Sequence, residues 1–527
     1  MIYVLLPENA LKSICGGFAA VLFCILLTVH IGCNEKHDTM PAPEQQQKPI
    51  RIQTRQVLIS TFLGNDKRKF YGIGPVPHPL VVRWKFKIGG DSTRIGKKTA
   101  KWYGTGWTGQ PSLVRDEGRE YLIIGGYDHC LRKIDAETGK ELWKYKFDDV
   151  IKGSPTLLET GDDIIILQGS RQGFKNSLRD TLIPSFRAIS YKTGHEIWRL
   201  NIPRTGSYSR DVDGSALIYK GKIIIGAENG IVYILDPMVI ERRQGILQPK
   251  ILRAFQLYTK EDVIKHRGNV TIESSPALLD DVLYISSGAG HIYGIDLKRD
   301  SIIWDFPTGS DLDGTITITE DRKLLCGIEK QYIKGQGGLI KLDPSKSPSR
   351  CVEWYFPTGN KNFASWEGGV IGSQSVREDP RHQMAAFNAI DGYLYVVSLN
   401  DTSGIGRGFD GRTLFSCPRL LFKKNIGGSI STPVFIDHHL ITQGYNEMIY
   451  VFDINDTTMV FSQVDSLNIG SIESTPIVWQ NRIFIGSRNG YFYCLGEKGT
   501  TVKDSTRQRR VIQKNNPFKS RKYFHAT

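Results

Sequence analysis

The chain has 527 residues, more than one hydrophobic core usually holds, so its length predicts several domains or one large array of repeats. Its formal net charge is +14, but no stretch interleaves basic residues with the aromatic platforms that bind bases, which argues against nucleic-acid binding. Much of the positive charge falls in residues 498–527, which have almost no apolar pattern and are predicted to form a basic disordered tail.

Residues 1–33 have the composition of a targeting or anchoring segment. An apolar run begins at Ser13, directly after Lys12, and ends in a Gly-Cys pair at Cys33. This order resembles a bacterial lipoprotein signal, in which Cys33 would become the first, lipid-bearing residue of the mature protein, although His30 departs from the usual Leu. An uncleaved transmembrane anchor is the alternative, because about 20 apolar residues span a bilayer. Both interpretations predict a chain tethered to a membrane outside the cytoplasm.

Residues 34–78 are polar and begin with a Pro- and Gln-rich stretch, so they are predicted to form a linker and lead-in. Residues 79–497 then repeat one pattern, seen in ESSPALL at Glu273 and ESTPIVW at Glu473. Each copy continues with short β-branched and aromatic runs between Gly-, Asn- or Asp-containing turns, which predict strands. The eight copies begin at Thr108, Lys152, Asp213, Glu273, Asp313, Glu367, Ile430 and Glu473.

A four-stranded unit repeated in this way is typical of a propeller blade. The last copy has only three strand-like runs, and the missing fourth matches PLVVRWKFKIGG, which begins at Pro79. Pairing this run with residues 491–496 would leave no bare sheet edge. The sequence therefore predicts an all-β, eight-bladed propeller of four-stranded antiparallel blades, closed by an N-terminal outer strand in the last blade. Its cysteines are expected to be buried thiols, with a Cys326–Cys351 disulfide left open.

The segments IDAETGKELW (134–143) and AISYKTGHEIW (188–198) resemble the Ala-x-Asp-x-x-Thr-Gly-x-x-x-Trp repeat of propellers related to quinoprotein dehydrogenases, the enzymes that use pyrroloquinoline quinone (PQQ). The resemblance covers residues 79–497 and implies that one Trp of each matching blade packs between blades. The matching residues are Trp84, Trp143, Trp198, Trp304 and Trp354.

An anchored chain with little beyond eight blades is similar to the envelope lipoproteins of this fold, among them the propeller lipoprotein of the outer-membrane β-barrel assembly machinery. That resemblance implies a non-catalytic scaffold that binds a protein partner in the bacterial cell envelope, at the outer membrane. A PQQ-dependent dehydrogenase is the rival interpretation. That family uses an adjacent Cys–Cys pair, a catalytic Asp and Ca²⁺, but no two cysteines are adjacent here, so we expect no PQQ. Motifs such as HExxH and GxSxG are also missing, and we expect no catalytic residues.

The first residue of each copy is predicted to face the channel, because the first strand of a blade is innermost. Five of these residues are acidic, namely Asp213, Glu273, Asp313, Glu367 and Glu473. Clustered carboxylates suit a basic ligand or a cation such as Ca²⁺, and Asp211 and Asp311 add a second carboxylate two residues before Asp213 and Asp313. The alternative is that these groups are solvated or accept hydrogen bonds from nearby backbone N–H groups.

Long loops on the same face carry a rim of aromatic residues, which are Trp102, Tyr103, Trp107, Tyr208, Phe363 and Trp366. Exposed aromatic residues concentrate binding energy, so this rim suits a protein or a carbohydrate ligand. The alternative is that the rings pack the loops onto the disc. The sequence thus predicts a protein-binding scaffold, with a carbohydrate- or cation-binding module as the second hypothesis.

Overall fold

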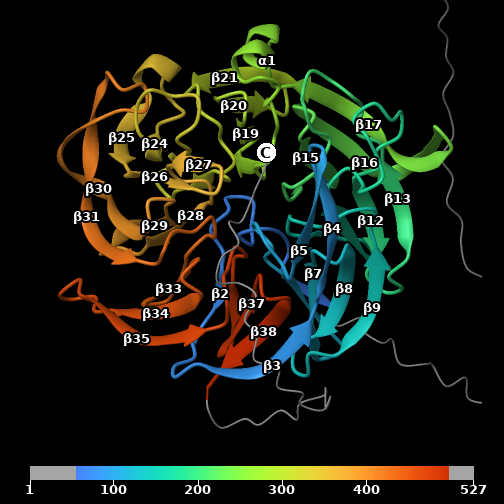
Figure 1. The fold of residues 1–527 in the computed structure, drawn as a ribbon, viewed down its shortest axis with the longest axis horizontal. Helices are drawn as coiled ribbons and strands as arrows, with labels where there is room; N and C mark the ends of the chain where they lie inside the picture. The colour runs from blue at the N-terminus through green and yellow to red at the C-terminus, as the bar shows by residue number, and fades with distance from the viewer. Residues whose placement is uncertain (1–54, 498–527) are drawn as a thin grey trace, which may run out of the picture. The chain divides into compact units, whose positions relative to one another are not determined.

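The computed structural model describes residues 55–497, which are almost entirely strands and turns. Eight sheets surround a central channel as the blades of a propeller, which confirms the predicted fold class (Figure 1). The helices in this range are α1 (Lys260–Lys265) and the 3-10 helix η1 (Pro348–Arg350), and neither is long and apolar enough to cross a membrane. Cys33, the anchor segment 1–33 and the tail lie outside the described residues.

Each blade is an antiparallel sheet whose strands follow chain order from the channel to the outer edge. Blade 1 contains β6 (Ser112–Asp116), β7 (Arg119–Gly125), β8 (Cys130–Asp135) and β9 (Glu141–Lys146), and blade 2 contains β10 (Thr156–Glu159), β11 (Ile164–Gly169), β12 (Phe186–Ser190) and β13 (Glu196–Leu200). Blade 3 contains β14 (Leu217–Tyr219), β15 (Lys222–Ala227), β16 (Ile231–Arg243) and β17 (Ile246–Gln256). Blade 4 contains β18 (Ala277–Leu279), β19 (Val282–Ser287), β20 (His291–Asp296) and β21 (Ser301–Pro307).

Blades 5 to 8 follow the same order, and blade 8 is completed from the other end of the chain. Blade 5 contains β22 (Thr317–Ile318), β23 (Leu324–Ile328), β24 (Gly338–Leu342) and β25 (Val352–Pro357), and blade 6 contains β28 (Gln374–Glu378), β29 (Gln383–Asn388), β30 (Tyr393–Arg407) and β31 (Leu414–Asn425). Blade 7 contains β32 (Val434–Ile436), β33 (His439–Gln443), β34 (Met448–Ile454) and β35 (Phe461–Asn468). Blade 8 contains β36 (Ile477–Trp479), β37 (Arg482–Gly486), β38 (Tyr491–Gly496) and β3 (Val81–Lys87). β3 pairs antiparallel with β38, as predicted, with Trp84 opposite Cys494 (blue beside red in Figure 1).

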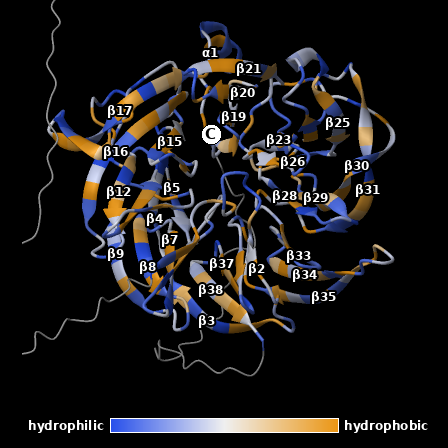
Figure 2. Ribbon diagram, turned by 180° about the vertical axis from the view of Figure 1, so that it is seen from behind, coloured by the Kyte–Doolittle hydropathy of each residue, from blue (hydrophilic) through white to orange (hydrophobic). Residues whose placement is uncertain are grey.

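The hydrophobic core is divided among the interfaces between blades. Middle strands such as β15 are apolar on both faces because a neighbouring blade covers each face, whereas outer strands such as β9 alternate between partly buried and exposed residues. Hydrophobic residues, orange in Figure 2, recur along the strands of the blades. Each of the eight interfaces holds one buried cluster, and the cluster between blades 8 and 1 contains Trp84, Ile124 and Phe484.

The repeated Trp of the outer strand contacts the next blade, as the family resemblance implies. The indole N–H of Trp84 donates to the carbonyl of Ala136 in blade 1 at 3.2 Å, and that of Trp143 donates to Tyr191 in blade 2 at 3.0 Å. Trp304 and Trp354 make the same contact with the blades that follow them. Trp198 is buried, but its indole N–H has no hydrogen-bond partner among the described residues.

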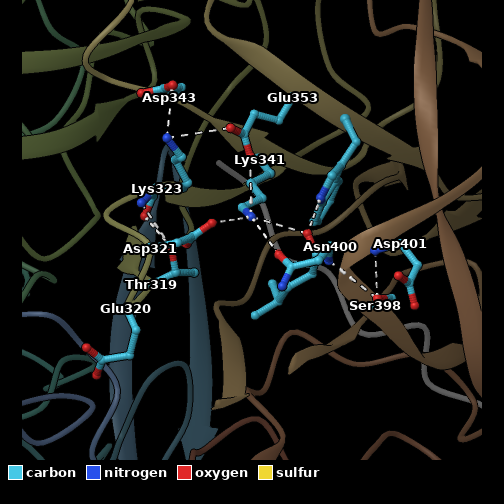
Figure 3. A network of polar contacts seen from close by, with 12 residues as sticks. Thr319, Glu320, Asp321, Lys323, Lys341, Asp343, Glu353, Ser398, Asn400 and Asp401 are labelled. Atoms are coloured by element: carbon cyan, nitrogen blue, oxygen red, sulfur yellow. Dashed lines mark hydrogen bonds and ion pairs between the residues drawn. The ribbon is translucent and has the colours of Figure 1, made fainter. Parts of the chain in front are cut away.

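A buried lysine ties blade 5 to blade 6. The ammonium group of Lys341, on β24, lies 2.8 Å from the Asp321 carboxylate within its own blade (Figure 3). It also donates to the Leu399 carbonyl at 3.2 Å and to the Asn400 side chain at 3.4 Å, both in blade 6. The indole of Trp354 donates to the same Leu399 carbonyl, so a polar pair and an aromatic ring fix this interface together.

Residues 55–78, which the sequence analysis assigned to the linker and lead-in, pack against the propeller. β1 (Gln56–Ile59) adds a fifth strand to the inner edge of blade 1, and β2 (Gly72–Ile73) pairs with β36. Between them the backbone carbonyls of residues 60, 66 and 67 accept hydrogen bonds from the inner strands of blades 2, 4 and 5. This stretch therefore runs across one end of the channel.

Arg68 holds this lead-in segment in place. Its side chain is fully buried, and its guanidinium donates to the carbonyl of Pro276 at 2.9 and 2.7 Å and to that of Phe62 at 2.8 Å. Burial lowers its pKa to about 9. The carbonyl acceptors satisfy a cation that has no carboxylate bonded to it within residues 55–497.

Two more hairpins and the cysteines complete the described chain. β4 (Gly90–Ile95) pairs with β5 (Lys98–Tyr103), and β26 (Asn360–Phe363) pairs with β27 (Trp366–Gly368). The five cysteines between residues 55 and 497 are free thiols and four of them are buried, so no Cys326–Cys351 disulfide forms.

Candidate functional site

A cavity of about 510 Å³ lies at the mouth of the channel. The hairpins β4–β5 and β26–β27 both contribute to it, as does the loop between β11 and β12. Its lining joins acidic, basic and aromatic side chains from loops that precede the inner strands and from loops that follow the second strands. This concave site is larger than a single water site and brings charged groups of both signs together, so it has the size and the polar contacts to hold a ligand or a segment of a partner.

A belt of hydrogen bonds sets the register of the residues around this mouth. The backbone N–H of Ser215 donates to the Ser275 hydroxyl at 2.9 Å, that of Ser275 to Thr315 at 3.0 Å, and that of Thr315 to Ser373 at 3.0 Å. These four residues occupy the same position in blades 3 to 6. The belt continues because the N–H of Ser373 donates to Thr432 in blade 7 at 3.2 Å.

The belt corrects one of the five acidic residues that were predicted to face the channel. Asp213, Glu273 and Asp313 each lie two residues before their belt residue, but in blade 6 this position belongs to Ile371. Glu367 lies four residues earlier, on β27, and is exposed outside the cavity lining. The prediction took Glu367 as the first residue of this copy, but Gly372 is the residue equivalent to Gly314 of blade 5, and the first position is therefore Ile371. The mouth is therefore acidic through blades 3 to 5 and apolar at Ile371 and Ile430.

The first carboxylate group consists of Asp213, Glu228 and Glu273, and it surrounds Lys152. The Lys152 ammonium forms an ion pair with Asp213 and lies 3.7 Å from Glu273 and 3.9 Å from Glu228. Burial alone would lower the pKa of Lys152, but the three carboxylates raise it well above its ordinary value. Burial, and then the neighbouring carboxylates, raise the pKa of Glu228 and Glu273.

The second carboxylate group consists of Asp311, Asp313 and Glu329, whose nearest oxygens all lie within 4.8 Å of one another. Asn269 donates to one oxygen of Asp311 at 2.5 Å, while Asp311 Oδ1 and Asp313 Oδ1 have no hydrogen-bond partner in residues 55–497. Burial, followed by repulsion within the group, raises the pKa of all three carboxyls well above the ordinary range. No lysine or arginine of the described chain forms an ion pair with this group.

The other carboxylates of the cavity are paired. Arg171 lies 2.7 Å from Asp211, and Arg488 lies 3.2 Å from Glu473. Thus Asp211, Glu473 and the first group each have a positively charged partner, whereas the second group forms no ion pair within residues 55–497. Because like charges destabilise one another in a buried site, the second group must either retain protons or accept a cation from outside the described chain.

The predicted aromatic residues divide into two sets. Trp102, Trp107, Tyr208 and Trp366 line the cavity, and the Trp107 ring lies 5.5 Å from the Lys152 ammonium. Phe363 stacks on Trp366 behind the lining, while Tyr103 is 39% exposed on the hairpin β4–β5. Trp102 and Trp107 are each only 8% exposed, so most of each ring packs against the protein and only a small part faces the cavity. Both interpretations of the aromatic rim, loop packing and contact with a ligand, therefore apply to these two rings.

Comparison with known proteins agrees with this architecture. The family model of the outer membrane protein assembly factor BamB matches residues 83–239 and 116–306. BamB of Shewanella oneidensis is 24% identical over 186 residues, which are 35% of this chain and 41% of that protein. The protein is a PQQ-like propeller similar to BamB.

Solved structures support the PQQ-like propeller fold over a longer span. BamB from Moraxella catarrhalis superposes with a TM-score of 0.50 at 13% identity, covering 79% of this chain and 99% of that one. The quinohemoprotein alcohol dehydrogenase from Comamonas testosteroni gives the same TM-score at 11% identity, covering 86% of this chain and 83% of that one. At these identities both show the fold alone. The match to the curated BamB spans about two fifths of that protein's length.

Lys152, Glu228 and Glu329 are central to the cavity of this PQQ-like propeller but were not among its predicted site residues. Lys152 occupies the first position of its copy and was set aside because it is not acidic. Glu228 and Glu329 directly follow the second strands β15 and β23. The equivalent residues of the other six blades are small, namely Gly126, Ser170, Gly288, Ala389, Gly444 and Ser487. Two Glu residues among small ones are a sequence signal that could have identified these positions.

Proposed function

We propose that this protein is a non-catalytic scaffold of the bacterial cell envelope, anchored to the outer membrane by a lipid on Cys33, which binds a protein partner through the face that carries the cavity. The similarity to BamB supports an assembly factor of the outer membrane. The observation that carries the proposal is the cavity face itself, where two hairpins that are not part of any blade flank a charged and aromatic pocket. Such features suit recognition of a partner by a few concentrated contacts.

Affinity purification tests this proposal. The tagged full-length chain would be isolated from gently solubilised envelopes, and a component of the outer-membrane assembly machinery is expected to co-purify in near-stoichiometric amount. Lys101→Glu with Lys361→Glu, on the two hairpins, should release that component. Lys144→Glu, a single charge reversal of the same kind on the outer strand β9, should not. A chain that elutes alone would contradict a stable scaffold.

A second candidate function is supported by the second carboxylate group. We infer that this group accepts a cation, either Ca²⁺ or a basic group of a ligand, because the other carboxylates of the cavity have positive partners. Calorimetric titration of the full chain with CaCl₂ and with a diamine separates the two cations, and Asp313→Asn should abolish the signal. Retention of the wild-type signal in Asp313→Asn would contradict binding at this group. A carbohydrate ligand on Trp107 or Trp366 would be seen as stabilisation by that sugar, lost in Trp107→Ala or Trp366→Ala.

A further inference from the structure

A cluster of histidines lies outside the cavity lining, where blade 7 meets the lead-in segment. His438 occupies the turn between β32 and β33, and His439 begins β33. Asp453, on β34, is the direct cross-strand partner of His439. In an antiparallel pair such residues present their side chains on the same face of the sheet. The side chains of three potential metal ligands therefore converge at the end of one hairpin.

The geometry of this trio suits a single metal ion. One ligand atom from each of His438, His439 and Asp453 lies within 4.8 Å of the others, and His438 Nε2 is 3.5 Å from Asp453 Oδ1. Two ligands on a tetrahedral zinc ion, with bonds of about 2.0–2.2 Å, lie about 3.3–3.5 Å apart. The pair His438 Nε2–Asp453 Oδ1 already has this spacing. The side chains of His438 and Asp453 are 54% and 41% exposed, so they are free to rotate and close the remaining separation.

A third imidazole, from a distant part of the sequence, lies beside this trio. His78 lies between β2 and β3, and its ring centroid is 5.3 Å from that of His439. Nδ1 of His78 is 3.3 Å from the carbonyl of Val76. When Nδ1–H donates to this carbonyl, Nε2 is left as the ring nitrogen with a free lone pair. A backbone carbonyl that orients one imidazole nitrogen in this way is the common support of metal-binding histidines.

The buried member of the cluster lacks a partner. His439 is 5% exposed, and its Nδ1 has no hydrogen-bond partner within residues 55–497. A buried ring nitrogen without a partner has a free-energy cost that a bound metal or a proton donor would remove. We propose that His78, His438, His439 and Asp453 together bind one Zn²⁺ ion, which joins the lead-in segment to blade 7. Three imidazoles with one carboxylate favour zinc over Ca²⁺, which prefers ligand sets made of oxygen.

This placement gives the metal a structural role beyond the proposed scaffold function. His78 lies three residues before β3, the strand that closes the ring against β38. A zinc ion at His78 would fix the entry of the closing strand to the neighbouring blade. Because the ion binds the folded ring and not the open chain, it is expected to raise the stability of the closed propeller.

Metal titration of the full-length chain, purified with a tag that contains no histidine and treated with a chelator, tests the proposal. We expect one ZnCl₂ equivalent to bind per chain, with a rise in Tm, and CoCl₂ to give the visible absorption bands of a tetrahedral Co²⁺ site. His438→Ala and Asp453→Asn change exposed side chains, so they should fold normally and weaken zinc binding at least about tenfold. His195→Ala, which removes an exposed turn histidine of blade 2, should bind zinc as the wild type does.

Two results would overturn the proposal. The first is no saturable binding of Zn²⁺ by the wild type, or equal affinity in the wild type and in the folded His438→Ala variant. The second concerns the link between the segments: if His78→Ala binds zinc with unchanged affinity and gains the same rise in Tm, the ion does not join the lead-in segment to blade 7.

Discussion

At the scale of single residues, the cavity depends on how buried charges are matched. Lys152 lies among the three carboxylates of the first group, and only 16% of its side chain is exposed. Removing one partner of a buried ion pair leaves the other charges without solvent or counter-charge, and this is far more costly than losing a surface pair. Lys152 is therefore the residue whose loss should most affect the stability of the channel mouth.

Lys152→Met is expected to lower the free energy of unfolding by about 3–5 kcal/mol at neutral pH. The loss should be smaller at pH 5, where the carboxyl groups left behind can take up protons. Chemical denaturation measures both values. The control is Lys220→Met, which breaks an exposed pair with Asp281 and should have little effect. Equal losses in the two variants would contradict the electrostatic account of the cavity.

The second carboxylate group should make the free energy of unfolding depend on pH with a sign opposite to that of ion-paired surface carboxylates. Its folded-state pKa values are raised by burial, so the folded chain binds more protons than the unfolded chain above the ordinary carboxyl pKa. The contribution of the group to stability is therefore greatest at or below about pH 4.5 and falls as pH rises through the raised values. For each of the three carboxyls, this loss of stability cannot exceed about 1.4 kcal/mol per pH unit.

Asp313→Asn combined with Glu329→Gln should remove part of this dependence. Between about pH 5 and pH 8 the free energy of unfolding of the double variant should decline less than that of the wild type. Denaturation curves at several pH values, in buffer free of divalent cations, measure the two slopes. Parallel slopes would show that these carboxyls have ordinary pKa values in the folded chain.

The sequence predicted some of these residues because their position in the repeat is regular. Asp213, Glu273, Asp313 and Glu473 do lie around the channel mouth, as the innermost placement of the first strand requires. Glu367 was misplaced because the hydroxyl belt, which sets the register, cannot be recognised before the strands are paired. Nor could the pairing of His78 with blade 7 be predicted, since turn histidines far apart in sequence carry no signal of contact.

At the scale of elements, the Thr-Gly turn of the repeat motif joins blades 1 and 2 to the blades before them. Gly139 follows Thr138 in the turn between β8 and β9, with φ of +71°, and a Cβ at this position would lie 2.8 Å from ring carbons of Trp84 in blade 8. Gly194 has the same relation to Trp143. The Gly of the motif is therefore required twice, by its left-handed backbone and by the ring packed against it.

Gly139→Ala and Gly118→Ala separate these two requirements. Gly118 has φ of +77°, but a Cβ there meets nothing within 4 Å. Both variants strain the backbone, and only Gly139→Ala also displaces Trp84. We expect Gly139→Ala to cost about 1–3 kcal/mol more stability than Gly118→Ala, measured by chemical denaturation. Equal costs would mean that the Trp84 contact contributes nothing beyond the turn.

The strands of the blades could be predicted at this scale because each apolar run is short, rich in β-branched residues and followed by a turn. The lead-in segment could not. Its packing depends on Arg68 reaching the Pro276 carbonyl of blade 4, 208 positions later, and a polar stretch gives no periodic signal of such a contact. The polar composition of residues 55–78 predicted a linker. The acceptors that allow Arg68 to be buried lie elsewhere in the chain, so the local sequence does not reveal that this stretch packs against the propeller.

At the scale of the whole molecule, the two faces of the ring differ. The lead-in segment runs across one end of the channel, while the other end opens into the cavity between the two hairpins. A partner that enters the mouth would meet the charged groups of blades 3 to 5 and the apolar residues Ile371 and Ile430. The fold alone does not assign such a role, because propellers of this type include enzymes and scaffolds.

Photo-crosslinking in living cells tests the scaffold account most directly. A photoreactive amino acid would replace Tyr103 on the cavity-face hairpin in one strain and Leu142 on the outer strand β9 in another, and crosslinked proteins would be identified by mass spectrometry. Both side chains are exposed, at 39% and 46%. The account predicts one dominant product, with an outer-membrane assembly component, from position 103 and none from position 142. The absence of any protein crosslink at position 103, or the same products from both positions, would contradict it.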